Sequence, residues 1–375
     1  MRFHAAAKSV SLLCLATPIL LISMQTARAQ GCIVARSSGT TAGPDSEGGY
    51  LSKGEWDVSV GYRHQFSFRH FVGPVEQTYR IQQGTEVMNK INLLSTSLTY
   101  QATPRFSFTA DVPVLFASRR SNNSPYTTTS QGIGDIIFSA RGWAWDPREN
   151  TRGNVGFTLG MMLPTGKTDV RNRVDAFNGK GPQDVVLDYS VQPGTGGYGL
   201  VFAWQSFLNL KSTQLYFDGS YIATPGNTTD VIRNTTTVPN PLTMSQYASI
   251  SDMYLLEAGL SHPIPHVRGL LFTIGPRMEG VPAEDLIGDS LGFRRPGFAI
   301  SIEPGVTYVR GRNMISANIG KAVYRDRTRS VPDKITGGHG DAAFADYVWL
   351  ASFSHRFGGP ASKSHHTPQQ DTGTK

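Results

Sequence analysis

The chain has 375 residues, of which 17% are charged and 40 are glycine, and it carries a net charge of +7. This positive excess is too small and too scattered to indicate a nucleic-acid partner. The length allows two or three soluble domains or one large β-barrel, and the glycine content favours strands and turns over helices.

The first 29 residues have the three parts of a secretory signal peptide. Arg2 and Lys8 form a basic start, residues 10–22 form an apolar run, and a small-x-small cleavage site ends at Ala29. A retained membrane anchor is the alternative, but the apolar run is short for a spanning helix. We therefore expect export and cleavage near Ala29.

The mature chain is expected to begin with a flexible segment, residues 30–53, which is rich in Gly, Ser and Thr. Cys32 would be its single cysteine, so no intrachain disulfide is expected. Lipidation of Cys32 is a weaker alternative, because the residues before it lack a large aliphatic side chain. No later apolar run reaches about 18 residues, which excludes helical membrane spans.

Alternating apolar and polar residues then predict twelve strands. The first begins at Gly54, and its apolar face extends over more residues than an ordinary globular strand has. The remaining strands are expected at residues 90–100, 106–117, 134–145, 154–163, 197–208, 213–223, 252–261, 269–280, 297–309, 313–324 and 346–357. The segment 185–191, inside the longest connection, is expected to add a strand extension above the membrane.

The connections between these strands alternate in length. Those near residues 101, 146, 209, 262 and 310 are short, whereas those near 70, 119, 164, 224, 282 and 325 are long. Outer-membrane barrels have short periplasmic turns and longer outer loops. The pattern therefore predicts an all-β, up-and-down antiparallel transmembrane β-barrel over residues 54–357, with both ends on the short-turn side. A soluble β-sandwich is the alternative.

The last strand has an apolar, aromatic-rich face backed by small or polar residues. We expect its aromatic residues to serve as the signal recognised by the barrel-assembly machinery. They are Tyr347, Trp349, Phe353 and Phe357. Membrane lipids are the other expected partner. A polar tail, residues 358–375, follows, although typical outer-membrane barrels end at the terminal aromatic residue.

Three short motifs resemble those of an outer-membrane barrel family named for the meta-pathway of phenol degradation. They are Gly-Ile-Gly-Asp at 132–135, Leu-Pro-Thr-Gly at 163–166 and Gln-Pro-Gly-Thr-Gly at 192–196. The motifs span about 65 residues and are moderately specific. Because that family name comes from genomic neighbourhoods, the resemblance implies transport of aromatic compounds only weakly.

Charged residues of both signs fall on the predicted inward faces, and charges within a membrane span are functional candidates. They are Asp57, Arg63, Asp111, Asp135, Arg141, Asp218, Glu257, Arg277, Glu279, Glu303 and Arg356. They line either a conducting lumen or an ion-pair network that fills the barrel. Twelve strands lie between filled eight-stranded barrels and open channels of about 16 strands.

The favoured function is passive passage of small solutes, aromatic or hydrophobic compounds among them, across the outer membrane of a Gram-negative bacterium. A phospholipase-like enzyme and an adhesive or structural barrel acting through its outer loops are the alternatives. Phospholipase barrels carry His and Ser two residues apart, and no His-x-Ser occurs here. His64 and His355 are predicted on the lipid face. We predict no cofactor, no metal and no catalytic residue.

Overall fold

The computed structural model describes residues 50–175, 181–232 and 242–358. The predicted signal peptide, Cys32 and the polar tail beyond Gly358 lie outside these described residues. Both of the described α-helices, α1 (Tyr79–Gln82) and α2 (Val331–Thr336), are too short to cross a membrane.

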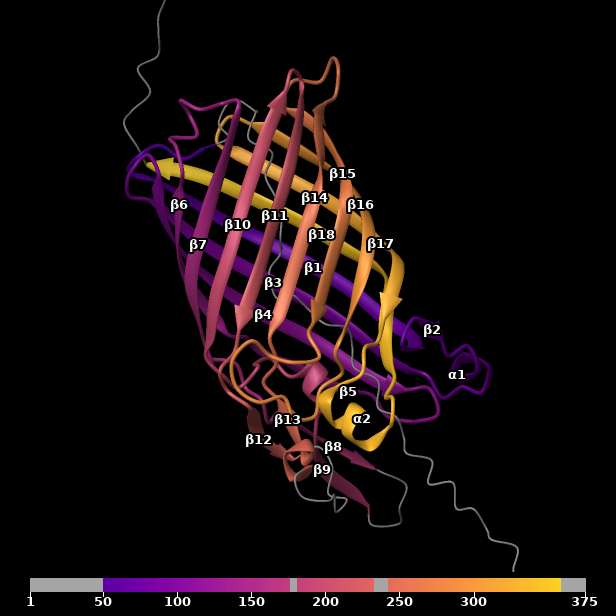
Figure 1. The fold of residues 1–375 in the computed structure, drawn as a ribbon. Coiled ribbons are helices and arrows are strands. Elements are labelled where there is room, and N and C mark those ends of the chain that lie inside the picture. The colour runs from indigo at the N-terminus through magenta and orange to yellow at the C-terminus, as the bar shows by residue number, and fades with distance from the viewer. Residues whose placement is uncertain (1–49, 176–180, 233–241, 359–375) are drawn as a thin grey trace, which may run out of the picture.

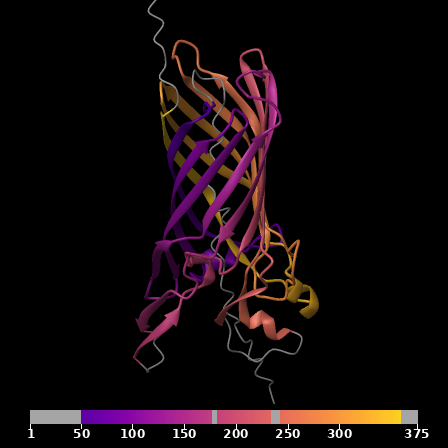
Figure 2. The same cartoon turned by 90° about the vertical axis from the view of Figure 1, so that its left-hand side faces the viewer.

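Twelve strands form a closed antiparallel barrel (Figures 1 and 2). In order around the wall they are β1 (Glu55–Val72), β3 (Val87–Gln101), β4 (Phe106–Ser121), β6 (Ile136–Trp143), β7 (Gly153–Leu163), β10 (Gly199–Leu210), β11 (Thr213–Ala223), β14 (Met253–Pro263), β15 (Leu270–Val281), β16 (Gly297–Arg310), β17 (Asn313–Asp326) and β18 (Ala342–Gly358). Pairing of β1 with β18 closes the barrel, with Trp56 opposite Phe357. Closure pairs the backbone groups of the two strands that would otherwise be edges. The predicted fold is therefore confirmed.

Short turns lie at one end of the barrel and longer connections at the other, the lower end in Figure 1. The turn between β16 and β17 consists of Gly311 and Arg312, and Gly311 has φ +58°. Glycine reaches this left-handed conformation without steric cost, which allows a two-residue hairpin. Glu55 pairs with Gly358, so the barrel strands begin and end on the short-turn side, as predicted.

The long connections carry more regular structure than the sequence indicated. Their short elements are β2 (Val75–Glu76), α1, β5 (Thr128–Ile133), β8 (Arg171–Asp175), β9 (Pro182–Val186), η1 (Tyr189–Val191), β12 (Thr228–Ile232), η2 (Leu242–Gln246), β13 (Tyr247–Ser249) and α2. The expected loop 119–131 is partly strand, because β5 folds back on the end of β4. The expected extension 185–191 is partly wrong, because β9 ends at Val186 and a 3-10 turn follows.

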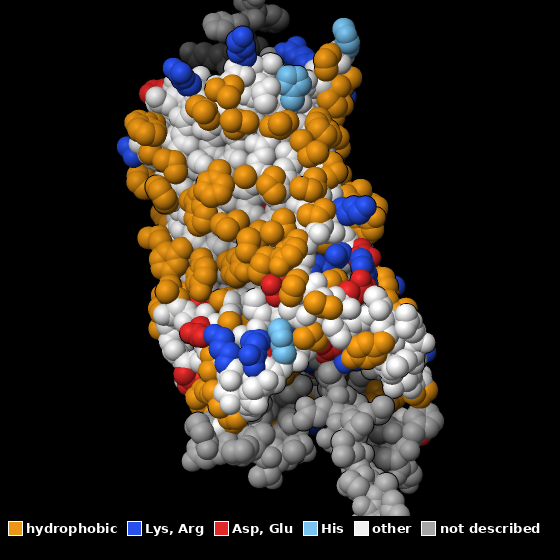
Figure 3. Space-filling model, turned by 45° about the vertical axis from the view of Figure 1, so that its right-hand side comes forward, with side chains coloured by type: hydrophobic (Ala, Val, Ile, Leu, Met, Phe, Trp, Pro, Cys, Tyr) orange, Lys and Arg blue, Asp and Glu red, His pale blue; other side chains and the backbone are white. Residues whose placement is uncertain are grey.

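The outward faces of the strands are apolar, as the alternation predicted. Phe157 and Leu159 on β7 are each 62% exposed, and Trp349 on β18 is 50% exposed. Figure 3 shows hydrophobic side chains as a broad belt across the face of the barrel in view. Such a belt is the surface that a strand barrel presents to the hydrocarbon core of a membrane.

The interior is less polar than the alternation predicted. Near the long connections, inward-facing apolar side chains from seven barrel strands pack into one buried layer, which we call the apolar layer. Its members are Phe71, Met162, Val201, Ile222, Met253, Val281, Ala342 and Phe344. The alternation of apolar outward and polar inward residues therefore does not hold at this end of the barrel.

Candidate functional site

Five charged side chains meet inside the barrel at mid-height, and we call them the charge bridge. They are Arg63 of β1, Glu257 of β14, Arg277 and Glu279 of β15, and Glu303 of β16. Arg63 donates to Glu279 through Nη1 at 3.0 Å and Nη2 at 2.5 Å. Arg277 donates to Glu279 at 3.0 and 3.1 Å and also forms an ion pair with Glu257.

The charge bridge spans the lumen. Three strands, β16, β17 and β18, separate β1 from β15 in the wall, so the Arg63–Glu279 contact crosses the interior rather than running along it. Arg63 is 0% and Arg277 2% exposed, so both side chains are packed among their neighbours inside the barrel. The sequence allowed two alternatives, a conducting lumen or an ion-pair network inside the barrel. The structure contains the ion-pair network.

Two amides complete the charge bridge. Gln65 accepts from Arg63 Nη2 at 2.9 Å, and Asn318 donates to Glu303 at 2.9 Å. Glu303 also lies 3.6 Å from Nη1 of Arg277. With two arginines and three glutamates, the ionised cluster carries one excess negative charge. Charges buried in this way are stable only when each keeps its partner.

Asp57, Asp111, Arg141 and Arg356 lie nearer the short-turn end and do not join the charge bridge, whereas Asp218 lies opposite Glu257 in the β11–β14 register. Asp57 is 4.0 Å from Arg356. Arg141 donates to Gln205 at 3.1 Å. Asp111 accepts from Ser97, and Asp218 accepts from the backbone of Ser206. Asp57, Arg356, Arg141 and Asp111 line a separate polar zone on the short-turn side of the bridge.

An aromatic cluster that sequence reasoning missed lies at the short-turn end of the interior. Trp143 and Phe207 are inward-facing and buried, with ring centroids 6.0 Å apart. Tyr50, which precedes β1, packs against both, at 5.6 and 5.8 Å. The inward alternation of β6 and β10 could have indicated Trp143 and Phe207, but nothing in the sequence indicated Tyr50.

Asp135 is not a lumen-lining residue of a strand, which corrects the prediction. It precedes β6 and is 1% exposed. Its carboxylate accepts from the backbone of Gly166 at 3.1 Å and from the backbone and hydroxyl of Thr195, each at 2.7 Å. Asp135 thus connects the three motifs at 132–135, 163–166 and 192–196. Gly166 and Gly194 touch there, since a Cβ on Gly194 would lie 2.1 Å from the Gly166 carbonyl oxygen.

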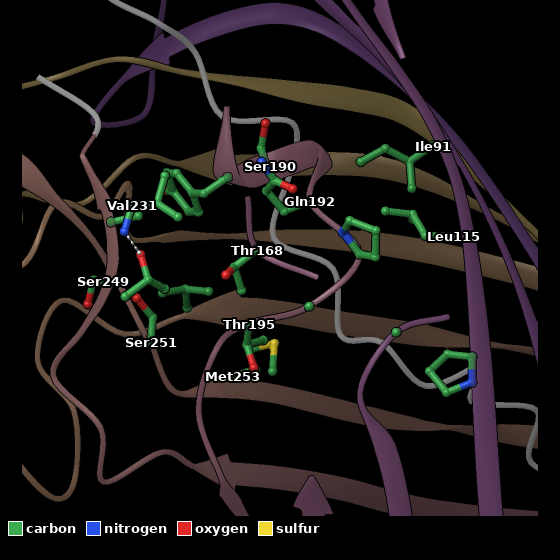
Figure 4. Close-up of a pocket in the computed structure, with 18 of the residues that line it drawn as sticks. Ile91, Leu115, Thr168, Ser190, Gln192, Thr195, Val231, Ser249, Ser251 and Met253 are labelled. Carbon is green, nitrogen blue, oxygen red and sulfur yellow. Dashed lines mark hydrogen bonds between the residues drawn. The ribbon is translucent and has the colours of Figure 1, made fainter. Parts of the chain in front are cut away.

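A cavity of about 100 Å³ lies between the barrel wall and the folded connections, on the long-connection side (Figure 4). Its apolar wall comes from inward-facing strand residues, namely Ile91, Leu93, Pro113, Leu115, Met253 and Val281. No charged side chain is among the described residues that line it. The hydroxyls of Ser190 and Ser251 are buried there and have no hydrogen-bond partner among the described residues. The cavity therefore suits a small, uncharged ligand.

The connection between β7 and β10 folds into the barrel and forms the roof of this cavity. Leu187 and Val191 are buried against Ile91, Leu93 and Leu115 of the wall. Asp188 holds this segment in place through Arg295, at 2.9 and 3.1 Å, and Arg119, at 3.6 Å. We call these three residues the latch.

Asp188, the carboxylate of the latch, stays ionised at neutral and mildly acidic pH. Burial alone would raise the pKa of Asp188, but the guanidinium groups of Arg119 and Arg295 outweigh burial and hold this pKa far below its usual range. A carboxyl with a lowered pKa stabilises the fold above its ordinary pKa of about 3.9 and loses that contribution only as pH falls further. The latch should therefore hold unchanged from pH 7 to pH 5.

Asp188→Asn is expected to release the roof segment. The substitution removes the carboxylate that neutralises two buried guanidinium groups, although Arg119 keeps its hydrogen bond to Asn89 at 2.7 Å. The loss costs about 3 kcal/mol. Amide hydrogen exchange over residues 187–195 should then speed up by roughly a hundredfold. Asp184→Asn, an exposed neighbour on β9, is the matched control and should leave exchange unchanged. Equal exchange in the two variants would show that the latch does not hold the roof.

The four residues predicted as an assembly signal all point outward on β18. Tyr347, Trp349, Phe353 and Phe357 are between 39% and 50% exposed. Phe357 stacks near Trp56 of β1, with ring centroids 6.4 Å apart, at the barrel's closing seam. Their recognition by an assembly machinery stays a prediction.

His64 and His355 do not lie close enough to act as a pair. His64 lies opposite Trp349, and His355 lies opposite Val58, so the two are separated along the β1–β18 seam. Each instead contacts an asparagine, His64 with Asn92 at 2.8 Å and His355 with Asn313 at 2.7 Å.

Fold and lumen together define a twelve-stranded barrel of the outer-membrane kind, with an apolar belt and a partly apolar interior crossed by buried ion pairs. No protein-family profile matches the chain, and no curated protein matches its sequence. Among solved structures, the chain is similar to an outer-membrane channel from Pseudomonas putida F1, with a TM-score of 0.55 and 12% identity over 85% of this chain and 100% of that one. At that identity the likeness shows the fold alone.

Two further likenesses are weaker. The translocator domain of the autotransporter NalP from Neisseria meningitidis has a TM-score of 0.43 and 12% identity over 82% of this chain and 90% of that one. The P. putida toluene transporter TodX has a TM-score of 0.41 and 10% identity over 89% of this chain and 100% of that one. Neither score carries an argument about function.

Proposed function

We propose that this protein is an outer-membrane channel for passive passage of small, uncharged, largely apolar solutes, aromatic compounds among them. The observation that carries the proposal is the cavity between the barrel wall and the folded connections, which has an apolar wall on the barrel side and no charged side chain among the described residues that line it. A cavity of roughly 150 Å³ in another protein is known to bind benzene. One of about 100 Å³ suits a single small ring with little rearrangement.

The proposed location follows from the belt and the connections. Apolar outward faces need a membrane, and a signal peptide with a closed strand barrel fits the outer membrane of a Gram-negative bacterium. The longer connections would face the cell exterior, so the cavity would open toward the outside. The charge bridge below it would act as the barrier that a solute passes only when Arg63 or its partners move.

An adhesive or structural barrel is the second candidate, because the buried ion pairs that cross the lumen favour it. Such a protein would act through its outer connections and leave its interior closed. The phospholipase-like alternative gains no support from the positions of His64 and His355.

Leu93→Trp is expected to abolish uptake. Leu93 faces the cavity, and an indole there would occupy much of its volume. Leu94 is the next residue on β3 and points outward, so Leu94→Trp is the matched control. Uptake of radiolabelled phenol at low concentration is measured in Gram-negative host cells, because a phospholipid vesicle passes small apolar solutes unaided.

The wild-type chain and Leu94→Trp should raise phenol uptake several-fold over cells without the protein, and Leu93→Trp should fall to that background. Glycerol, a polar solute of similar size, should gain much less. A folded wild-type protein that gives no uptake above background would contradict the proposal and favour the adhesive barrel.

A further inference from the structure

Two lysines stand on the outward face of the barrel, where other side chains are mostly apolar. Lys90 of β3 and Lys321 of β17 are both exposed, and neither forms an ion pair with a described residue. A lysine on a lipid-facing surface is costly at the membrane centre and is tolerated near the boundary with water. Both lysines therefore indicate a polar or anionic environment at their height.

The strand register puts the two lysines in one row with two aromatic residues. Lys321 pairs with Tyr347 of β18, and Lys90 pairs with Phe66 of β1. Phe66 lies in the irregular step of the β1–β18 seam, between the pairs Gln65–Val348 and Ser67–Ala345, and so beside Tyr347. The outward row is Lys321, Tyr347, Phe66 and Lys90, and it spans about 14 Å over four neighbouring strands.

The row lies toward the long connections. Lys90 is the fourth residue of β3, and five residues follow Lys321 in β17, and both of these strand ends face the connections. Figure 3 shows basic side chains along the lower border of the hydrophobic belt, on the connection side. In the orientation that the proposed function requires, this border is the headgroup level of the outer leaflet.

Nearby acidic groups do not cancel the charge of the row. Asp346 is the closest carboxylate in sequence to Tyr347. It is already held by Arg69 at 2.8 Å and by Arg325 at 2.5 Å. The row therefore presents two unpaired ammonium groups, with aromatic rings between them.

We propose that the row Lys321, Tyr347, Phe66 and Lys90 binds the phosphorylated headgroup of an anionic outer-leaflet lipid. Ammonium groups attract phosphate oxygens at a membrane surface, and aromatic rings favour the lipid–water boundary. The belt below the row would contact the acyl chains. Because free phosphate has no acyl chains, the contact between the belt and the acyl chains favours a lipid over free phosphate. The inference rests on the outer-membrane orientation in the proposed function, but not on transport.

Binding of lipid A is the test, with the purified full-length protein in a zwitterionic detergent. Native mass spectrometry counts the lipid bound, and the shift of the melting temperature confirms it. The wild-type protein should retain lipid A and should bind the same lipid without phosphates at least tenfold more weakly. The double variant Lys90→Gln, Lys321→Gln should lose at least tenfold in affinity for lipid A.

Lys211→Gln, at an exposed turn on the opposite end of the barrel, is the matched control and should bind as the wild type does. Inorganic phosphate at millimolar concentration should not displace the lipid. Equal binding by the double variant, or equal binding of the dephosphorylated lipid, would overturn the proposal. Phenol uptake is read separately, so loss of uptake with retained lipid binding would count against the transport function alone.

Discussion

Arg277→Ala is expected to destabilise the barrel more than any other single substitution in the lumen, by about 3–5 kcal/mol. Arg277 is the one side chain of the charge bridge that contacts Glu257, Glu279 and Glu303 together. Without it, three buried carboxylates face one another, and only Glu279 keeps a cationic partner, Arg63. Like charges at this separation in a dry interior cannot all remain ionised.

The measurement is unfolding by urea of the protein reconstituted in vesicles, followed by tryptophan fluorescence. Arg310→Ala, an exposed arginine at the end of β16 on the same barrel, is the control and should change stability by less than about 0.5 kcal/mol. Arg277→Lys should recover part of the loss, because a lysine keeps the charge but not the planar fork. A loss from Arg277→Ala no larger than that of the control would show that the charge bridge is wet and its charges screened.

Arg63→Ala is expected to open the lumen. Arg63 alone connects β1 to the carboxylates on the far wall, while Glu279 would keep Arg277 as a partner. The substitution therefore removes a side chain that crosses the lumen without leaving Glu279 unpaired. It also raises the excess negative charge of the cluster from one to two, which favours cations.

Single-channel recording in planar bilayers should show a several-fold higher conductance for Arg63→Ala than for the wild type, with a preference for potassium over chloride. Arg312→Ala, at the short turn between β16 and β17, is the control and should conduct as the wild type does. An unchanged, very small conductance in Arg63→Ala would place the barrier elsewhere, at the latch or at the Tyr50 aromatic cluster.

The wall of the barrel could be predicted from sequence because apolar and polar residues alternate along each strand with a period of two. Phe157 and Leu159 point outward and Thr158 points inward, as the alternation over β7 requires. This period depends only on local backbone geometry, so it can be recognised in one strand without knowing which strands are its neighbours. The lengths of the connections then indicated which end of the barrel carries the short turns and which end carries the long connections.

The contacts across the lumen could not be predicted in the same way. Arg63 and Glu279 were both assigned to the inside, but their pairing depends on barrel closure and strand stagger, which bring β1 opposite β15. Asp135 was misassigned because β6 begins two residues later than the alternation indicated, at Ile136 rather than at residue 134. Its partners Gly166 and Thr195 lie in the other two motifs, a link that no local pattern contains.

The apolar cavity was missed for a different reason. Ile91, Leu93 and Leu115 follow the inward alternation of β3 and β4, but apolar residues on both faces of a strand weaken the period-two signal there. Their packing partners, Leu187 and Val191, belong to a connection whose fold is set by the Asp188 latch. The latch residues Arg119, Asp188 and Arg295 belong to three segments that are far apart in the sequence, so no local pattern indicates that they meet.

The central claim is that alternate residues of each strand face lipid and lumen, and site-directed spin labelling along β7 tests it most directly. Cysteines replace Phe157, Thr158 and Leu159 one at a time, with Cys32 changed to serine, in protein reconstituted in vesicles. Labels at 157 and 159 should collide readily with oxygen dissolved in the hydrocarbon, and the label at 158 should be shielded from it. Equal exposure at all three positions, or exposure of 157 and 159 to a water-soluble relaxation agent instead, would contradict the account.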